Sequence, residues 1–147
     1  MDPFRADLHC HSTCSDGSDE PSALLHLAKR ASLQGLSITD HDTMVAYTPE
    51  LFALAKELGI RLLPGVEVSS ELDGIPVHIL GYGLTSPEFL LEIQEMRRER
   101  NRAILKKLAE KKMPIAEEEL QGEILGRPHI AKLLVEKGYV GSMQEAF

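Results

Sequence analysis

The sequence predicts an α/β fold of short parallel strands and intervening helices, and two observations support this prediction. Short aliphatic or β-branched runs alternate with segments of helical periodicity along the first half of the chain, which is the pattern of βαβ units. Four successive strand-like runs also carry a residue that commonly binds metal, and in an α/β barrel such residues come from the carboxyl ends of several strands. We therefore expect the 147 residues to form part of a (β/α) barrel.

The first predicted strand covers residues 4–11, and a helix follows it. The segment Ser18-Asp-Glu-Pro21 predicts the start of this helix, with capping side chains, acids in the first turn and a proline whose missing N–H does no harm. The apolar residues at helical spacing are Leu24, Leu27, Ala28 and Ala31. We expect the helix to end at Gly35 and the second strand to cover residues 36–39.

A second helix and a hairpin are expected next. The helix is predicted over residues 49–58 and is closed by Gly59. Strands over residues 62–67 and 76–82 follow, and the dipeptide Asp73-Gly74 is typical of the turn of a β-hairpin.

The most informative motif is Asp7-Leu-His-Cys-His-Ser-Thr-Cys-Ser-Asp16-Gly, directly after the start of the first strand. Because side chains alternate along a strand, His9 and His11 point the same way and Cys10, expected to be a small buried residue, points the other way. Two neighbouring imidazoles can chelate one divalent metal ion, and the carboxylate of Asp16 can hold a second. The alternative is that these histidines only line a polar strand edge.

Three further ligand-type residues make the metal interpretation more specific. They are His41 in Thr-Asp-His-Asp-Thr, Glu67 in Pro-Gly-Val-Glu-Val-Ser, and His78 in Val-His-Ile. A lone His-x-His pair is weak evidence, whereas an ordered series at the ends of successive strands is hard to produce by chance.

These motifs, over residues 1–85, resemble the PHP (polymerase and histidinol phosphatase) family of metal-dependent phosphoesterases. The segments Gly126-Arg-Pro-His129 and Arg100-Asn-Arg102 further resemble one subgroup, the nucleoside 3′,5′-bisphosphate phosphatases and RNase AM-type 5′→3′ exoribonucleases. The resemblance implies a distorted (β/α)7 barrel with a helical segment inserted after the early strands.

We accordingly expect residues 1–85 to form the N-terminal half of the metal-binding barrel and residues 86–147 to form the inserted, substrate-proximal helical segment. The family pattern also requires a later ligand histidine and a C-terminal Asp-x-His pair. The one histidine after His78 is His129, whose setting at a helix start does not match those ligands, and no such pair occurs between His78 and Phe147. A (β/α) barrel typically needs about 250 residues. We expect the chain to be the amino-terminal part of a larger enzyme or a truncated gene product, with the rest of the barrel absent.

The inserted segment is predicted to be mainly helical. A long helix over residues 86–112 is ended by Met113-Pro114, and a second helix covers residues 128–137 with Gly138 after it. Its many arginines are typical of an exposed helix with i,i+4 ion pairs.

Four residues of this segment are candidate substrate contacts. The resemblance places Arg100 and Asn101 beside the substrate. Arg127 and His129 flank the start of the second helix, where free N–H groups and the helix dipole favour anions. The alternative for His129 is that it caps the helix or faces water.

The resemblance also implies a set of metal ligands. His9 and His11 hold one ion, Asp16 and His41 a second and His78 a third, with Glu67 bridging the first and third. Up to three divalent ions are expected. Mixed nitrogen and oxygen ligands suit Mn²⁺, Fe or Zn²⁺, with Mg²⁺ also possible, and the resemblance favours Mn²⁺. No catalytic residue outside these ligands is expected, since a metal-activated hydroxide attacks phosphorus. Candidates to orient the imidazoles are Asp7, Asp40 and Asp42, although ordinary turn chemistry is an equal alternative for Asp42.

Composition narrows the class of protein. The chain has 23 acidic and 16 basic residues and a net charge of −7, which argues against a broad DNA-binding surface. It shows no apolar run of membrane-spanning length and no signal-peptide pattern, and two cysteines are too few for a disulfide framework. We expect a cytoplasmic protein that can self-associate through an open barrel edge.

The expected function is hydrolysis of phosphate esters of nucleotides, as a 3′,5′-nucleoside bisphosphate 3′-phosphatase, a 5′→3′ exoribonuclease on short RNA, or both. One alternative is a truncated or non-catalytic PHP remnant. The other is a PHP phosphatase of a different substrate, such as histidinol phosphate, or a PHP module of a polymerase.

Overall fold

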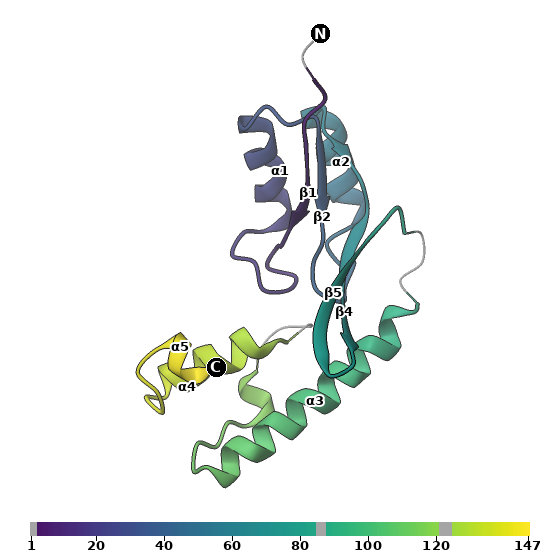
Figure 1. Ribbon diagram of the computed structural model, residues 1–147. Helices are drawn as coiled ribbons and strands as arrows, with labels where there is room; N and C mark the ends of the chain where they lie inside the picture. Colours follow the sequence, from purple (N-terminus) through teal and green to yellow (C-terminus); the bar gives the residue numbers. More distant parts are fainter. Residues whose placement is uncertain (1–2, 85–87, 121–124) are drawn as a thin grey trace. The chain divides into compact units, whose positions relative to one another are not determined.

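The computed structural model describes residues 3–84, 88–120 and 125–147, and the chain divides into two compact units, Met1–Leu90 and Leu91–Phe147. Strands and helices mix, as the predicted α/β class requires (Figure 1). The elements in chain order are β1 (Ala6–Cys10), α1 (Pro21–Arg30), β2 (Gly35–Ile38), α2 (Pro49–Leu58), β3 (Arg61–Leu62), β4 (Gly65–Leu72), β5 (Ile75–Tyr82), α3 (Leu90–Glu110), a 3₁₀ turn (Glu117–Glu119), α4 (Arg127–Glu136) and α5 (Met143–Ala146).

The strands of the first unit form two sheets. β1, β2 and β3 make a parallel sheet in that order, and β4 pairs antiparallel with β5. The prediction of a single strand over residues 62–67 is wrong. β3 ends at Leu62, and the chain enters the other sheet at Gly65 as β4. Pro64 lies between these two strands, and a proline has no N–H to donate to a neighbouring strand. Among the described residues the two sheets stay open and do not close into a barrel.

A β-bulge interrupts β1 at the start of the His-x-His motif. Asp7 pairs with Leu36 and Cys10 pairs with Ile38, so β1 carries one extra residue between these two rungs. The Asp7 side chain accepts a hydrogen bond from the His9 backbone N–H at 3.0 Å. The Asp7 carboxylate thus satisfies a backbone N–H within the bulge.

The ends of α1 differ from the prediction. The residue that precedes the helix is Glu20, which makes no capping hydrogen bond, and the first turn contains no acid. The helix ends at Arg30, and Gly35 already begins β2. Ser32 has φ 57°, in the left-handed region, and there the chain turns back toward the sheet before Gly35. The predicted caps and first-turn acids are therefore wrong for α1.

The second helix and the hairpin agree with the prediction. Thr48 caps α2 by accepting from the Leu51 N–H at 3.2 Å, and Gly59 ends it with φ 69°. Asp73 and Gly74 both have positive φ, 52° and 79°, which is the conformation of a tight hairpin turn.

A small hydrophobic core lies between α1, α2 and the parallel sheet. Its buried members are Leu25, Ala28, Leu36, Ile38, Ala46, Leu51, Ala55 and Ile60. The predicted apolar stripe of α1 is confirmed at Ala28, which is buried, and at Leu24, which packs against the core. It is wrong at Leu27, which is 39% exposed, while Leu25, which was not predicted, is fully buried. Neighbouring helical positions are about 100° apart, and the core selects the face that packs on β2 and α2.

The second unit is helical and has its own core. The predicted long helix is observed as α3, Leu90–Glu110, while residues 86 and 87 of the prediction lie outside the described residues. α4 begins one residue earlier than expected, and α5 was not expected. The buried members of this core are Leu105, Ile115, Leu120, Ile130 and Leu134. No described helix has the length and apolar character needed to cross a membrane.

Candidate metal centre

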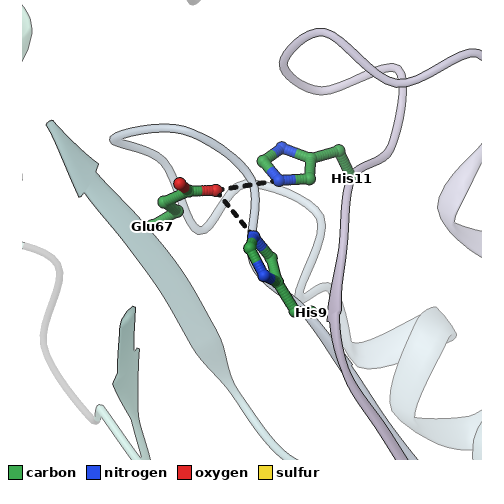
Figure 2. A group of neighbouring side chains, drawn as sticks. All are labelled: His9, His11 and Glu67. Atoms are coloured by element: carbon green, nitrogen blue, oxygen red, sulfur yellow. Dashed lines mark hydrogen bonds and ion pairs between the residues drawn. The ribbon is translucent and has the colours of Figure 1, made fainter. Parts of the chain in front are cut away.

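The buried carboxylate of Glu67, on β4, is the centre of the candidate site. Its Oε2 atom lies 3.0 Å from Nε2 of His9 and 2.9 Å from Nε2 of His11. Figure 2 shows both imidazoles pointing at this carboxylate from the end of β1. On the other side, Oε1 lies 2.7 Å from Nδ1 of His78 on β5. The prediction that His9 and His11 point the same way agrees with this geometry.

A second carboxylate, Asp16, lies on the loop after β1. Its Oδ1 atom is 3.1 Å from Nδ1 of His11, and its Oδ2 atom is 3.5 Å from Nε2 of His41. His41 also approaches Glu67, with Nδ1 at 3.9 Å from Oε2. His41 therefore lies between the two carboxylates.

The six predicted ligands thus converge in three overlapping groups, in each of which the ligand atoms lie within 4.8 Å of one another. The groups are His9, His11 and Glu67; His11, Asp16 and His41; and His41, Glu67 and His78. One further observation fits a cation at this place. Nδ1 of His41 is buried and has no hydrogen-bond partner among the described residues. Imidazole nitrogens and carboxylate oxygens are together the ligands that Mn²⁺, Fe and Zn²⁺ accept.

Electrostatics keep both carboxylates ionised. Hydrogen bonds from His11 and then His41 hold the pKa of Asp16 well below its usual range. The same contact with Asp16 raises the pKa of His11, although burial works against this. Burial alone would raise the pKa of Glu67, but the His9 hydrogen bond and the neighbouring imidazoles more than offset it, so that this pKa is lowered. The ionised carboxylates of Asp16 and Glu67, with imidazole nitrogens around them, form an arrangement that suits a bound cation.

The loop that carries His11 and Asp16 has a tightly specified conformation. A Cβ atom at Gly17 would lie 2.2 Å from the His11 carbonyl oxygen, so only glycine fits there. Ser12 and Ser15 are buried and donate their hydroxyl groups to the carboxylate of Asp40, each at 2.6 Å. Sequence reasoning missed these two serines, because their partner is 25 or more residues away in the chain.

The three aspartates expected to orient imidazoles each accept a hydrogen bond from a backbone N–H. Besides the Asp7 contact described above, Ser12 N–H donates to Asp40 at 2.7 Å and Ser69 N–H donates to Asp42 at 2.6 Å. All three aspartates therefore hold the backbone of segments that carry candidate ligands. Orientation of the imidazoles by these side chains stays a prediction.

Cys10 packs behind the candidate site. It is partly buried against the core of the first unit, and its thiol donates to the Ser37 carbonyl oxygen at 3.4 Å. Burial, followed by the charges of Asp7 and Asp40, raises the pKa of Cys10 to about 12. The thiol therefore keeps its proton at neutral pH, which agrees with its expected packing role.

The four predicted substrate contacts lie in the second unit. Arg100 and Arg127 line a cavity of about 340 Å³ whose other walls are mostly apolar. Asn101 is 6% exposed and donates from Nδ2 to the Leu125 carbonyl oxygen at 2.9 Å. His129 accepts from the N–H of the residue preceding α4 at 3.1 Å, which is the helix-capping alternative considered above. The structure thus brings Arg100 and Arg127 to one cavity, whereas the side chains of Asn101 and His129 hydrogen-bond to backbone groups of residues 125 and 126.

Comparisons with known proteins agree with this geometry. The PHP domain family matches residues 7–136. The chain is 38% identical to the 5′-3′ exoribonuclease Rnm of Escherichia coli over 96% of its length, and 33% identical to the 3′,5′-nucleoside bisphosphate phosphatase of Chromobacterium violaceum, also over 96%. It covers 52% and 53% of these two proteins, so it spans about half the length of the curated relatives it matches.

A solved structure shows the same fold. The crystal structure of a metal-dependent phosphoesterase from Bifidobacterium adolescentis matches 98% of the chain with a TM-score of 0.80 at 28% identity. The chain covers 54% of that protein. The family match extends over most of the sequence and includes all six candidate ligands. On these grounds the chain belongs to the PHP domain family of metal-dependent phosphoesterases.

Proposed function

We propose that the protein is a metal-dependent phosphoesterase that hydrolyses phosphate esters of nucleotides. The observation that carries this proposal is the convergence of six ligand-type side chains from β1, the loop after it, the segment after β2 and the β4–β5 hairpin. Two relatives that match nearly all of the chain are named as an exoribonuclease and a nucleoside bisphosphate phosphatase, which supports a nucleotide or short RNA as substrate.

The three groups suggest how divalent ions would be held. His9 and His11 with Glu67 would bind one ion, Asp16 and His41 a second, and His78 with Glu67 a third. Glu67 suits a bridging role because its two oxygens face different histidines. The donor set favours Mn²⁺, Fe or Zn²⁺, and we propose Mn²⁺.

When bound, such ions would lower the pKa of a water molecule and stabilise charge on the phosphoryl group. The residues of the chain supply the setting. The side chain of Glu67 is only 6% exposed, and its lowered pKa keeps it ionised, so it can bind cations from the buried side of the site. The side chains of His9 and His78 are about half exposed, 51% and 49%, so the candidate site is open to solvent on this side and a phosphate ester can reach it.

Substrate selection would come from groups outside the ligand set, because the metal chemistry is common to many phosphoesters. We propose that Arg100 and Arg127 contact the phosphate or ribose groups of a nucleotide, and that Asn101 and His129 support them. The products would be a 3′-dephosphorylated nucleotide, or 5′-nucleotides released stepwise from RNA. The acidic composition is consistent with a cytoplasmic enzyme of small substrates that has no broad DNA-binding surface.

The test is metal content together with phosphatase activity. Wild-type protein, purified and desalted, should retain at least one transition-metal ion per chain by elemental analysis. Replacing Glu67 by Gln should lower this content strongly, whereas Glu71→Gln, an exposed carboxylate on the same strand, should leave it unchanged. Folded wild-type protein without metal, and without Mn²⁺-stimulated release of phosphate from a nucleoside 3′,5′-bisphosphate, would overturn the proposal and favour the non-catalytic alternative.

A further inference from the structure

His41 lies between two aspartates whose side chains are almost completely removed from solvent. Asp40 is 1% exposed and Asp42 is 0% exposed. Burial of a carboxylate is costly unless hydrogen bonds replace its water, so the partners of such a group show what it stabilises. The two carboxylates have different partners, although only one residue separates them in the chain.

Asp40 holds the loop after β1. Its Oδ1 atom accepts from the Ser12 N–H at 2.7 Å and from the Ser15 hydroxyl at 2.6 Å, and its Oδ2 atom accepts from the Ser12 hydroxyl at 2.6 Å. The Ser12 hydroxyl in turn accepts from the Cys14 N–H at 3.1 Å. These bonds fix the turn between His11 and Asp16, which are the two ligands that the loop contributes.

Asp42 holds strand β4 instead. The backbone of the His41 segment already pairs with this strand, since Glu67 N–H donates to the Asp40 carbonyl at 3.2 Å and Asp42 N–H donates to the Glu67 carbonyl at 3.0 Å. Asp42 then turns away with φ 54°, a left-handed conformation that aspartate tolerates better than most residues. Its carboxylate accepts a hydrogen bond from the Ser69 N–H, which is the next N–H after that of Glu67 on the same edge of β4. The side chain thereby extends the ladder by one rung.

This extra rung lies next to another candidate ligand. Ser69 is the direct partner of His78 in the β4–β5 ladder, so whatever fixes the backbone of Ser69 also fixes the position from which His78 projects. The two aspartates therefore act on opposite sides of His41, one on the Asp16 loop and the other on the hairpin.

We propose that Asp40 and Asp42 are positioning residues with separate tasks. Asp40 sets the geometry of the group containing Asp16, and Asp42 sets the geometry of the group containing His78. The inference rests on the proposed metal-dependent function for its effect on metal binding. Its structural part, the fixing of two different segments, does not depend on any bound ion.

The test compares each aspartate with the ligand it is proposed to position. Mn²⁺ binding to the full chain is measured by calorimetric titration in wild type, Asp40→Ala and Asp42→Ala, with Asp16→Ala and His78→Ala as references. Loss of groups that support metal ligands typically costs about 10–100-fold in metal affinity. Asp40→Ala should lower the Mn²⁺ affinity of the Asp16-dependent step, the one that Asp16→Ala removes, by this factor. The affinity of the His78-dependent step, the one that His78→Ala removes, should stay within threefold of wild type. Asp42→Ala should show the reverse pattern.

Double variants make the assignment sharper. Asp40→Ala combined with Asp16→Ala should be no worse than Asp16→Ala alone, whereas its combination with His78→Ala should be additive. Asp73→Asn, at the exposed hairpin tip, is the matched control and should bind Mn²⁺ like wild type. Equal weakening of both steps by both aspartate variants, or no weakening by either, would overturn the inference.

More conservative variants test the inference if the Asp40→Ala or Asp42→Ala protein does not fold. Ser15→Ala removes one donor to Asp40 and leaves every ligand in place, so it should shift the Asp16-dependent step in the same direction by a smaller factor. Asp42→Asn keeps an oxygen acceptor for Ser69 and should restore the His78-dependent step relative to alanine. Failure of both would contradict the proposal.

Hydrogen exchange in metal-free protein separates this inference from the proposed function. The Ser12 amide should exchange faster in Asp40→Ala and the Ser69 amide faster in Asp42→Ala, each without the other. Wild-type protein that binds no Mn²⁺ but shows these two patterns would refute the proposed function and leave the positioning roles intact. Unchanged exchange at both amides would refute the positioning roles themselves.

Discussion

The phenolic oxygen of Tyr47 accepts a hydrogen bond from the backbone N–H of Gly65 at 2.9 Å. It accepts a second one from the Ile38 N–H, also at 2.9 Å, and lies 2.5 Å from the Ile38 carbonyl oxygen, to which it can donate its proton. One hydroxyl group thus joins the end of β2 to the start of β4. Glu67 follows Gly65 by two residues, so this junction fixes the strand that carries the central carboxylate of the candidate site.

Replacing Tyr47 by Phe should destabilise the first unit. The ring remains, but the N–H groups of Ile38 and Gly65 lose their shared acceptor inside the protein, and an unsatisfied buried donor costs about 1–3 kcal/mol. We expect the free energy of unfolding in urea to fall by at least about 1 kcal/mol. Tyr139→Phe is the control, because its hydroxyl makes an exposed hydrogen bond to the Pro114 carbonyl. Equal stability of the two variants would contradict this role of Tyr47.

Replacing Gly17 by Ala should damage the metal-binding loop more than the rest of the protein. The new methyl group would collide with the backbone of His11, so the loop must shift and move Asp16 away from its partners. We expect Mn²⁺ affinity to fall about tenfold, as for lost supporting contacts at metal sites. Gly81→Ala is the comparison, because its methyl group would meet its nearest neighbour at an ordinary 3.4 Å. Undiminished affinity in the Gly17 variant would show that the loop adapts.

The apolar face of the β4–β5 hairpin predicts self-association of the chain. Val77 and Ile79 lie on the face opposite to His78 and are 36% and 55% exposed. Exposed apolar strands favour pairing or packing with other chains. Sedimentation velocity of the 147-residue chain should therefore show concentration-dependent association, and Val77→Thr with Ile79→Thr should reduce it. A monodisperse monomer at high protein concentration would contradict the prediction.

The candidate ligands could be predicted from the sequence because their signal is local. His9 and His11 are two residues apart at the expected end of a strand, and strand alternation predicts that they lie on one side. Both do face Glu67, although His11 lies just beyond the end of β1. His41 follows β2, as expected for a ligand at the carboxyl end of a parallel strand. Glu67 and His78 do not fit this expectation, because Glu67 is the third residue of β4 and His78 lies in the middle of the antiparallel strand β5. The residue types and their order were enough to name these ligands, whereas the hairpin register that brings His78 to Glu67 is visible only in the structure.

Other features depend on partners far apart in the chain, and the sequence gives no local sign of them. Tyr47 reads as an ordinary aromatic residue before a helix, yet it replaces backbone pairing between two strands. Ser12 and Ser15 read as loop serines until Asp40 is placed beside them. The buried face of α1 was predicted only in part: Ala28 and Leu24 pack in the core, but Leu25 is buried in place of Leu27. Several faces of this helix carry apolar residues, and only the packed core decides which of them are buried.

The last prediction concerns the substrate and uses the cavity of the second unit. Arg127 is exposed at the start of α4 and lines this cavity together with Arg100, so its guanidinium group is available to an anionic ligand. A hydrogen bond to a charged group contributes about 1.5–3 kcal/mol, which corresponds to about 10–150-fold in affinity. Arg127→Ala should therefore raise KM for a nucleoside 3′,5′-bisphosphate by about this factor.

The comparison substrate and the control variant decide what Arg127 does. A small phosphoester such as p-nitrophenyl phosphate offers no second phosphate or nucleoside, so Arg127→Ala should leave kcat and KM for it close to wild type. Lys132→Ala removes another exposed cation of the same helix, one that pairs with Glu136 at 3.8 Å, and should leave KM for both substrates unchanged. If Arg127→Ala reduces turnover of the two substrates equally, this residue supports the fold or the metal centre, and the proposed nucleotide contact loses its main support.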